Sequence, residues 1–172
     1  MPDPKRNSPP KHSPKNGLLQ SIGRWFQSSG RFFLRRQRGS ARATAPLRLG
    51  LAGEQAAARF LQRIGYRILA RSHRQRLGEI DLIALDGDCL VFVEVKTWSS
   101  PDSGDPSLAV DRRKQEKLSR AAIVYLKRRG LLEQRCRFDV VSIVWPTDRR
   151  AQPVIRHFPN AFEAIGRGQM FR

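Results

Sequence analysis

The chain has 172 residues and a formal charge of +18, from 33 Lys and Arg against 15 Asp and Glu. This length suits one domain of ordinary size. A membrane-spanning helix needs about 18 consecutive apolar residues, and no run in the chain approaches that length. The first residues are polar and lack the apolar core of a secretory signal. The positive charge predicts a polyanionic partner, nucleic acid first and an anionic membrane surface second.

Residues 1–46 are the most basic part of the chain. Positions 1–50 hold 11 basic residues and one acid, Asp3. Residues 1–16 are rich in Pro, Lys and Ser, which predicts disorder. Apolar residues recur at helical spacing in residues 18–34. That pattern is typical of an amphipathic helix on a membrane or nucleic acid, of an arm packed on the domain, or of a targeting sequence. We expect a basic arm, largely disordered or amphipathic.

A helix is expected over residues 49–64, where Ala57 and Leu61 lie on one apolar stripe. Counting back from Ala57 places Glu54 on the same stripe. Two interpretations stay open: a carboxylate that faces the core, or a solvated acid in the first helical turn, where it stabilises the helix dipole. Gly65 then ends the helix.

A strand is predicted over residues 66–72 and a β-hairpin over residues 78–97. In the hairpin, two apolar runs flank an Asp-Gly-Asp sequence at 86–88, which is a strong turn signal. The intervening basic loop carries Arg74 and Arg76, which we expect to contact nucleic acid.

Two acids and a lysine stand within the apolar runs of the hairpin. Because strand side chains alternate between faces, Glu94 and Lys96 are neighbours on one face. Asp81 lies in the first strand, which the turn brings alongside. Charges are costly to bury unless they are paired or bind a metal, so these residues indicate chemistry. The alternative is an edge hairpin whose polar face is open to water.

A second helix is expected from Asp111, a typical N-cap, to about residue 129, with Gly130 as its stop. Lys114 lies one turn before the apolar stripe of this helix, and either points towards the sheet or stays solvated. The basic residues expected to bind nucleic acid here are Arg112, Arg113, Lys114 and Lys117.

Strands over residues 137–144 and 153–158 complete the pattern, the last at a sheet edge because of Pro153. The fold class is therefore α/β, with a central mixed sheet of about five strands flanked by helices. We expect the domain to span residues 47–165, followed by a tail over 166–172. Cys89 and Cys136 lack metal-type spacing and indicate buried, reduced thiols.

Carboxylates that converge from adjacent strands make a site suited to Mg²⁺ or Mn²⁺. Such an ion lowers the pKa of a bound water and neutralises charge that develops on a phosphate. Asp81 and Glu94 would bind it, and Glu54 would complete the shell or bind a second ion. Lys96 would position or deprotonate the water, or hold the phosphate.

Four motifs occur in fixed order within residues 49–162: Gly53-Glu54-x-x-Ala57-Ala58-x-x-Leu61, Gly78-Glu79-Ile80-Asp81-Leu82-Ile83-Ala84, Val91-Phe92-Val93-Glu94-Val95-Lys96 and Arg137-Phe138-Asp139-Val140-Val141. Together they resemble the YraN-like family, an uncharacterised bacterial group also called UPF0102. The resemblance implies a restriction-endonuclease-like three-layer core, similar to archaeal Holliday-junction resolvases and other PD-(D/E)xK nucleases. It places Asp81, Glu94 and Lys96 on the metal-binding and catalytic positions, and Glu54 on the helix acid that many of these nucleases use.

By analogy with that superfamily, we expect a metal-dependent endonuclease that hydrolyses DNA phosphodiester bonds, in branched or irregular DNA. The expected location is the cytoplasm, at the nucleoid, and a homodimer is one expected assembly. The alternative is a non-catalytic nucleic-acid-binding protein that retains the nuclease fold. A peripheral membrane contact through residues 18–34 concerns the arm alone.

The sequence departs from the family pattern at two places. Ser72-His73-Arg74 stands where Asn-x-Arg is usual, and Thr97-Trp98 where an Arg often follows Glu-x-Lys. Neither change removes a metal ligand, so they concern contacts with substrate. Of the other charged residues, we expect Glu79 to face away from Asp81, Asp139 to pair with an arginine, and His73 to lie in the basic loop.

Overall fold

The computed structural model describes residues 44–75, 78–99, 110–146 and 151–165. Residues 1–43 of the arm predicted over 1–46, and the predicted tail over 166–172, lie outside them. The elements in chain order are α2 (Ala45–Arg63), β1 (Arg67–Gln75), β2 (Gly78–Asp86), β3 (Cys89–Trp98), α3 (Arg112–Arg129), β4 (Cys136–Val144) and β5 (Val154–Phe162).

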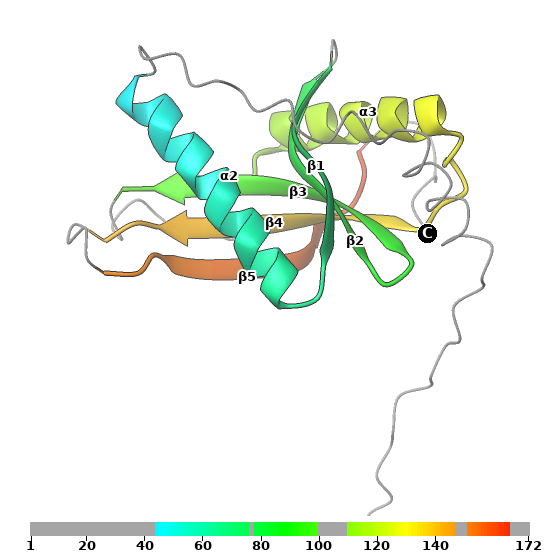
Figure 1. The fold of residues 1–172 in the computed structure, drawn as a ribbon. Coiled ribbons are helices and arrows are strands. Elements are labelled where there is room, and N and C mark those ends of the chain that lie inside the picture. Colours follow the sequence, from blue (N-terminus) through cyan, green and yellow to red (C-terminus); the bar gives the residue numbers. More distant parts are fainter. Residues whose placement is uncertain (1–43, 76–77, 100–109, 147–150, 166–172) are drawn as a thin grey trace, which may run out of the picture. The chain divides into compact units, whose positions relative to one another are not determined.

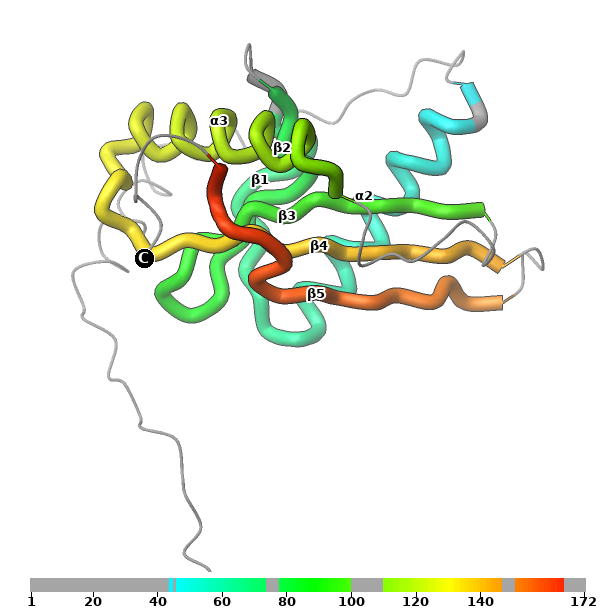
Figure 2. Tube along the Cα trace, turned by 180° about the vertical axis from the view of Figure 1, so that it is seen from behind, coloured from blue at the N-terminus to red at the C-terminus, as the bar shows by residue number. Residues whose placement is uncertain are grey.

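The five strands form one sheet in the order β1-β2-β3-β4-β5. Strands β3 and β4 are parallel, and the other neighbouring pairs are antiparallel. A parallel pair needs a crossover connection, and α3 lies in the connection between β3 and β4. Seen from opposite sides, α2 crosses one face of the sheet and α3 lies along the other (Figures 1 and 2). The predicted α/β class with a five-stranded mixed sheet is confirmed, and it is a restriction-endonuclease-like core.

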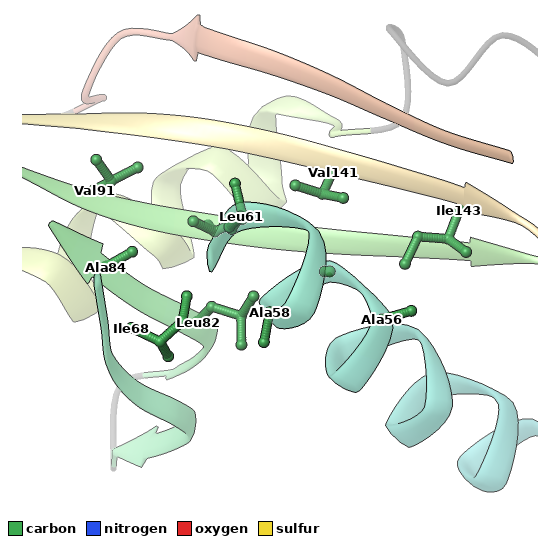
Figure 3. Packing of buried hydrophobic residues seen from close by; sticks show 11 residues of the cluster. Ala56, Ala58, Leu61, Ile68, Leu82, Ala84, Val91, Val141 and Ile143 are labelled. Carbon is green, nitrogen blue, oxygen red and sulfur yellow. The ribbon is translucent and has the colours of Figure 1, made fainter. Parts of the chain in front are cut away.

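Helix α2 covers its face of the sheet with small and branched side chains (Figure 3). Ala57, Ala58 and Leu61 pack against residues of β2, β3 and β4 and are fully buried. The helix begins at Ala45, with Pro46 in its first turn, a position that proline suits because no backbone N–H is needed there. It starts four residues earlier than the periodicity predicted. Glu54 is therefore in the middle of the helix, and the first-turn interpretation is wrong.

Helix α3 has the caps that its sequence predicts. The Asp111 side chain accepts the backbone N–H of Lys114 at 2.7 Å, and Gly130 ends the helix with φ of +64°. The ring of Tyr125 packs edge-on to Phe92 of β3, with 5.8 Å between centroids. Within the described residues, no helix is long and apolar enough to cross a membrane.

Two strands are longer than the sequence predicted. Antiparallel pairing with β2 continues to Arg74 and Gln75, so His73 lies in β1 rather than in a loop. The His73 ring contacts Tyr125 edge-on, and its pKa is lowered by burial and by the charges of Arg129 and Arg128. Strand β5 runs on to Phe162 and occupies a sheet edge, as Pro153 indicated.

Helix α2 passes very close to β3 at Gly53. A Cβ atom at this position would lie 2.0 Å from Thr97 Oγ1. We expect Gly53→Ala to lower the free energy of unfolding by about 1–3 kcal/mol, because the helix or the Thr97 side chain must shift to make room. Gly50→Ala is the matched control in the same helix, since a Cβ there meets nothing within 4 Å. It should stabilise by about 0.5–1 kcal/mol. Urea unfolding of both variants measures the difference, and equal effects would contradict the close contact.

Candidate active site

The acidic residues of the hairpin lie where β2 and β3 part. Pairing between these strands ends at Leu82 and Val93, whereas β3 stays paired with β4 as far as Trp98. The next residue of each strand is Asp81 and Glu94. Asp81 Oδ2 accepts the backbone N–H of Val95 at 2.8 Å, across the point of separation. The backbone of β3 thus fixes the position of the Asp81 carboxylate.

Glu94 is the most deeply buried acid of this set, with 3% of its side chain exposed. Its Oε1 lies 2.9 Å from Lys114 Nζ and 3.2 Å from Lys96 Nζ. Its Oε2 is also buried, and among the described residues it has no hydrogen-bond partner. One oxygen of Glu94 is therefore saturated by two ammonium groups, while the other is available to a further ligand. A buried carboxylate oxygen without a partner is costly unless something binds it.

The pKa of Asp81 is raised from 3.8 to about 7, mainly by burial and next by the negative charge of Glu94. The Val95 N–H and the charge of Lys114 oppose the increase. Two carboxylates that share a site cannot both ionise freely. A bound divalent cation would remove that repulsion and favour the ionised form of both.

Lys114 points towards the sheet, so the solvated interpretation of this residue is wrong. Burial alone would lower its pKa, but the charge and hydrogen bond of Glu94 raise it, with smaller contributions from Asp81 and Glu79. Lys114 is therefore an ammonium ion at neutral pH. The contribution of Glu79 shows that the expectation of an acid facing away from Asp81 is wrong, because residues two apart in a strand lie on the same face.

Glu54 reaches the site from α2 through Ser72 of β1. The Ser72 hydroxyl donates to Glu54 Oε2, and the charge of Glu54 contributes to the raised pKa of Asp81. In the β1–β2 pairing, Arg71 lies opposite Leu82 and His73 lies opposite Ile80. Ser72, between them, therefore lies opposite Asp81. Ser72 has φ of +45°, a region that asparagine, the residue of the family pattern here, enters more readily. Backbone strain of this kind clusters at functional sites.

Two carboxylates and their surroundings fit a magnesium site. Across the described part of the chain, no three His, Cys, Asp or Glu side chains group closely enough to hold a metal ion. Mg²⁺, however, keeps several waters and often takes only one or two protein carboxylates together with substrate phosphate. Asp81 and the unpartnered Oε2 of Glu94 supply that set. Glu54, hydrogen-bonded to Ser72, stays a predicted ligand.

The basic residues expected to contact nucleic acid are divided between two places. Arg112, Arg113 and Lys117 are exposed on α3, where Arg112 also pairs with Glu116 at 3.7 Å. The side chain of Arg74 and all of Arg76 lie outside the described residues. Sequence reasoning missed Arg120, which is exposed on α3 one turn after Lys117. Its helical spacing from Arg113 and Lys117 was the available signal.

A second polar cluster lies on the α2 side, around Asp139 of β4. This side chain is 0% exposed and accepts hydrogen bonds from Arg137 Nε at 2.9 Å and from the Asn160 backbone at 3.0 Å, with His157 Nε2 at 2.9 Å. Arg137 also donates to Asp86 at 2.9 Å and to the Tyr66 hydroxyl at 2.6 Å. The predicted arginine pair is confirmed, and its other partners had no sequence signal. This cluster holds β2, β4, β5 and the connection between α2 and β1 together.

The fold and the Asp, Glu-x-Lys arrangement on β2 and β3 define a restriction-endonuclease-like domain. The chain belongs to the uncharacterised protein family UPF0102, whose family model matches residues 53–143. It is 49% identical over 120 residues to UPF0102 protein RB9115 of Rhodopirellula baltica, which covers 69% of this chain and 72% of the relative. It is 53% identical over 117 residues to UPF0102 protein STH1475 of Symbiobacterium thermophilum, which covers 68% of this chain and 98% of the relative. These names assign no activity.

The raised pKa of Asp81 has a consequence for stability. Between 3.8 and about 7 the folded protein binds more protons at Asp81 than the unfolded chain, so this residue costs stability as pH rises through that interval. We expect Asp81→Asn, whose amide oxygen can still accept the Val95 N–H, to stabilise the protein at pH 8 by about 1–3 kcal/mol and to have little effect near pH 4.

Urea unfolding at the two pH values measures this difference. Asp88→Asn, at an exposed residue of the hairpin turn, is the control and should show no pH-dependent gain. An Asp81→Asn protein no more stable than the wild type at pH 8 would contradict the raised pKa.

Proposed function

We propose that this protein is a metal-dependent endonuclease that hydrolyses phosphodiester bonds in DNA. The observation that carries the proposal is the unpartnered, buried Oε2 of Glu94 beside Asp81, with Lys96 at 3.2 Å from the other oxygen. A carboxylate pair with an adjacent lysine can hold a divalent ion and a phosphate oxygen together, which supports phosphodiester hydrolysis.

Asp81 and Glu94 would hold Mg²⁺ or Mn²⁺, the ion that supplies an activated water and neutralises charge on the phosphate. The other roles, which are to hold the phosphate and to set the charge near Asp81, belong to side chains of the protein. Lys96 lies on the same strand face as Glu94 and is partly exposed, so its ammonium can hold a phosphate oxygen near the two acids. Glu54, through Ser72, keeps further negative charge near Asp81.

The positive charge of helix α3 favours DNA as the polyanionic partner. It carries eight Lys and Arg residues against one acid, Glu116. Arg113, Lys117 and Arg120 follow one another at intervals of three or four residues, so they form a row on one side of the helix. All three are exposed. A row of cations that begins beside Lys114 can follow a phosphate backbone away from the site. Binding of this kind also favours a location at the nucleoid.

The proposal is tested by incubation of the purified full chain with labelled duplex, four-way junction, splayed and single-stranded DNA, with Mg²⁺, with Mn²⁺ or with EDTA. We expect cleavage that requires the divalent ion and is most efficient on branched or irregular DNA. Absence of metal-dependent cleavage from all four substrates would overturn the enzymatic proposal.

A second function is a nucleic-acid-binding protein without catalysis, favoured by the basic row on α3, which does not depend on the carboxylates. The affinity of such a protein for DNA should fall steeply as the salt concentration rises. An Asp81→Asn and Glu94→Gln double variant distinguishes the two functions. If the site is catalytic, the variant loses metal binding and cutting but keeps DNA affinity. If the wild type binds no divalent ion at millimolar concentration, the binding function is correct.

Two further partners are proposals with their own tests. A two-fold dimer would place two active sites on two strands of one junction, and sedimentation of the full chain with and without junction DNA would detect it.

Residues 18–34 would contact an anionic membrane surface. Liposome flotation with and without residues 1–46 tests that contact.

A further inference from the structure

Two lysines from different elements converge on one oxygen of Glu94. Lys96 comes from β3, two residues beyond Glu94, and its Nζ lies 3.2 Å from Oε1. Lys114 comes from the first turn of α3 and lies closer, at 2.9 Å. One buried carboxylate is thus paired with two ammonium groups, one more than its own charge needs, and the charges of Asp81 and Glu79 also act on Lys114. The second cation calls for an explanation.

We propose that Lys114 is a resident cation of the site, which leaves Glu94 when a divalent ion binds and then serves a phosphate of the DNA strand. In the metal-free protein the Lys114 ammonium is paired with the buried Glu94 carboxylate, together with that of Lys96. Asp81 and Glu94 would hold the divalent ion, whose charge would neutralise the same carboxylate and repel the ammonium. The exchange rests on the proposed function, because it requires the metal.

Lys114 has room to move. Its side chain is 33% exposed, close to the 28% of Lys96, so its ammonium can turn outwards without a change in the core. Lys114 differs from Lys96 in its place on α3, beside the exposed Arg113 and Lys117. Its backbone is fixed, because its N–H donates to Asp111 at 2.7 Å and the adjacent Gln115 side chain donates to the Val110 carbonyl at 2.9 Å. The side chain can therefore swing while the helix stays in place.

The direction of that movement leads to the basic row. Arg113 and Lys117 are exposed neighbours of Lys114 on the same helix. An ammonium released from Glu94 would join them and extend the row to the metal site. Metal and DNA would then favour one another's binding, since each stabilises the arrangement that the other needs.

Chemical labelling of lysines follows the exchange in the wild-type protein. The full chain is treated briefly with acetic anhydride, with and without Mg²⁺, and acetylation at Lys114 and Lys127 is measured by mass spectrometry. Lys127 is exposed at the far end of α3 and is the control. We expect Mg²⁺ to increase labelling of Lys114 several-fold and to leave Lys127 unchanged. Glu94→Gln should label fast at Lys114 without any metal.

Metal affinity gives a second readout. Isothermal titration with Mn²⁺ should show that Lys114→Met binds the ion at least about threefold more tightly than the wild type, because the competing charge is gone. Lys127→Met should bind as the wild type does. Circular dichroism confirms that each variant is folded.

The outcomes separate this inference from the proposed function. If Mn²⁺ binds but Lys114 stays protected, or if Lys114→Met binds Mn²⁺ no more tightly, the resident-cation inference is overturned while the metal site stands. If neither wild type nor Lys114→Met binds Mn²⁺, the proposed function fails and the exchange fails with it. Slow labelling of Lys114 in Glu94→Gln would overturn the ion pair itself.

Discussion

Replacing Glu94 with Gln is expected to lower metal-dependent DNA cleavage by at least about a hundredfold, since even groups that only support a metal ligand contribute 10–100-fold. The substitution keeps the size of the side chain but removes the charge. The unpartnered Oε2 can then no longer bind a cation as a carboxylate does. Lys96 and Lys114 would also face each other across a neutral amide.

Cleavage rates at saturating Mg²⁺, measured beside DNA affinity, test this expectation. Glu133→Gln makes the same chemical change at an exposed position after α3 and should cleave as the wild type does. DNA affinity of Glu94→Gln should be preserved, because the basic row on α3 is unchanged. If Glu94→Gln keeps more than about a tenth of the wild-type rate, Glu94 does not hold the catalytic ion.

Asp139→Asn is expected to lower the free energy of unfolding by about 3–5 kcal/mol, the usual cost when one partner of a buried ion pair is removed. Nitrogen atoms from three residues surround the Asp139 carboxylate, so an amide NH₂ there would face another N–H. Arg137 would keep Asp86 but lose its fully buried partner. Urea unfolding gives the loss directly.

The same network gives a pH dependence of defined sign. Burial alone would raise the pKa of Asp139, but hydrogen bonds from His157, Arg137 and the Asn160 backbone lower it overall. A lowered pKa means that the network contributes its stability above the ordinary pKa of the carboxyl and loses it as pH falls. The gap between wild type and Asp139→Asn should therefore shrink below about pH 4. Asp88→Asn, at an exposed pair with Arg135, should cost under about 1 kcal/mol. A comparable loss in both variants would contradict the role of burial.

The sequence predicted the fold well where local signals determine it. The Asp-Gly turn, the Asp111 cap and the Gly130 stop are short-range features, and each lies where its residues indicated. The start of α2 was placed too late because Ala45 to Leu47 lack the apolar stripe, although proline suits a first turn. Strand β1 was cut short because its polar end is stabilised by pairing with β2, which no local pattern reveals.

The sequence predicted which charged residues form the candidate site, but not how their side chains are arranged. Asp81, Glu94 and Lys96 stood out as charges in apolar strands. The convergence of Lys114 on Glu94 depends on where α3 packs against the sheet, and the Ser72 contact depends on a backbone angle of +45°. Such features arise from tertiary packing, which periodicity does not encode. The same holds for His157, which reaches Asp139 from a distant edge strand.

The most direct measurement is anomalous diffraction from crystals of the full chain grown or soaked in Mn²⁺. We expect one strong peak bound by Asp81 and by Glu94 Oε2, with Lys114 Nζ displaced from Glu94. Peaks only at other residues, or none at millimolar Mn²⁺ with both carboxylates well ordered, would contradict the metal site on which the proposed nuclease activity depends.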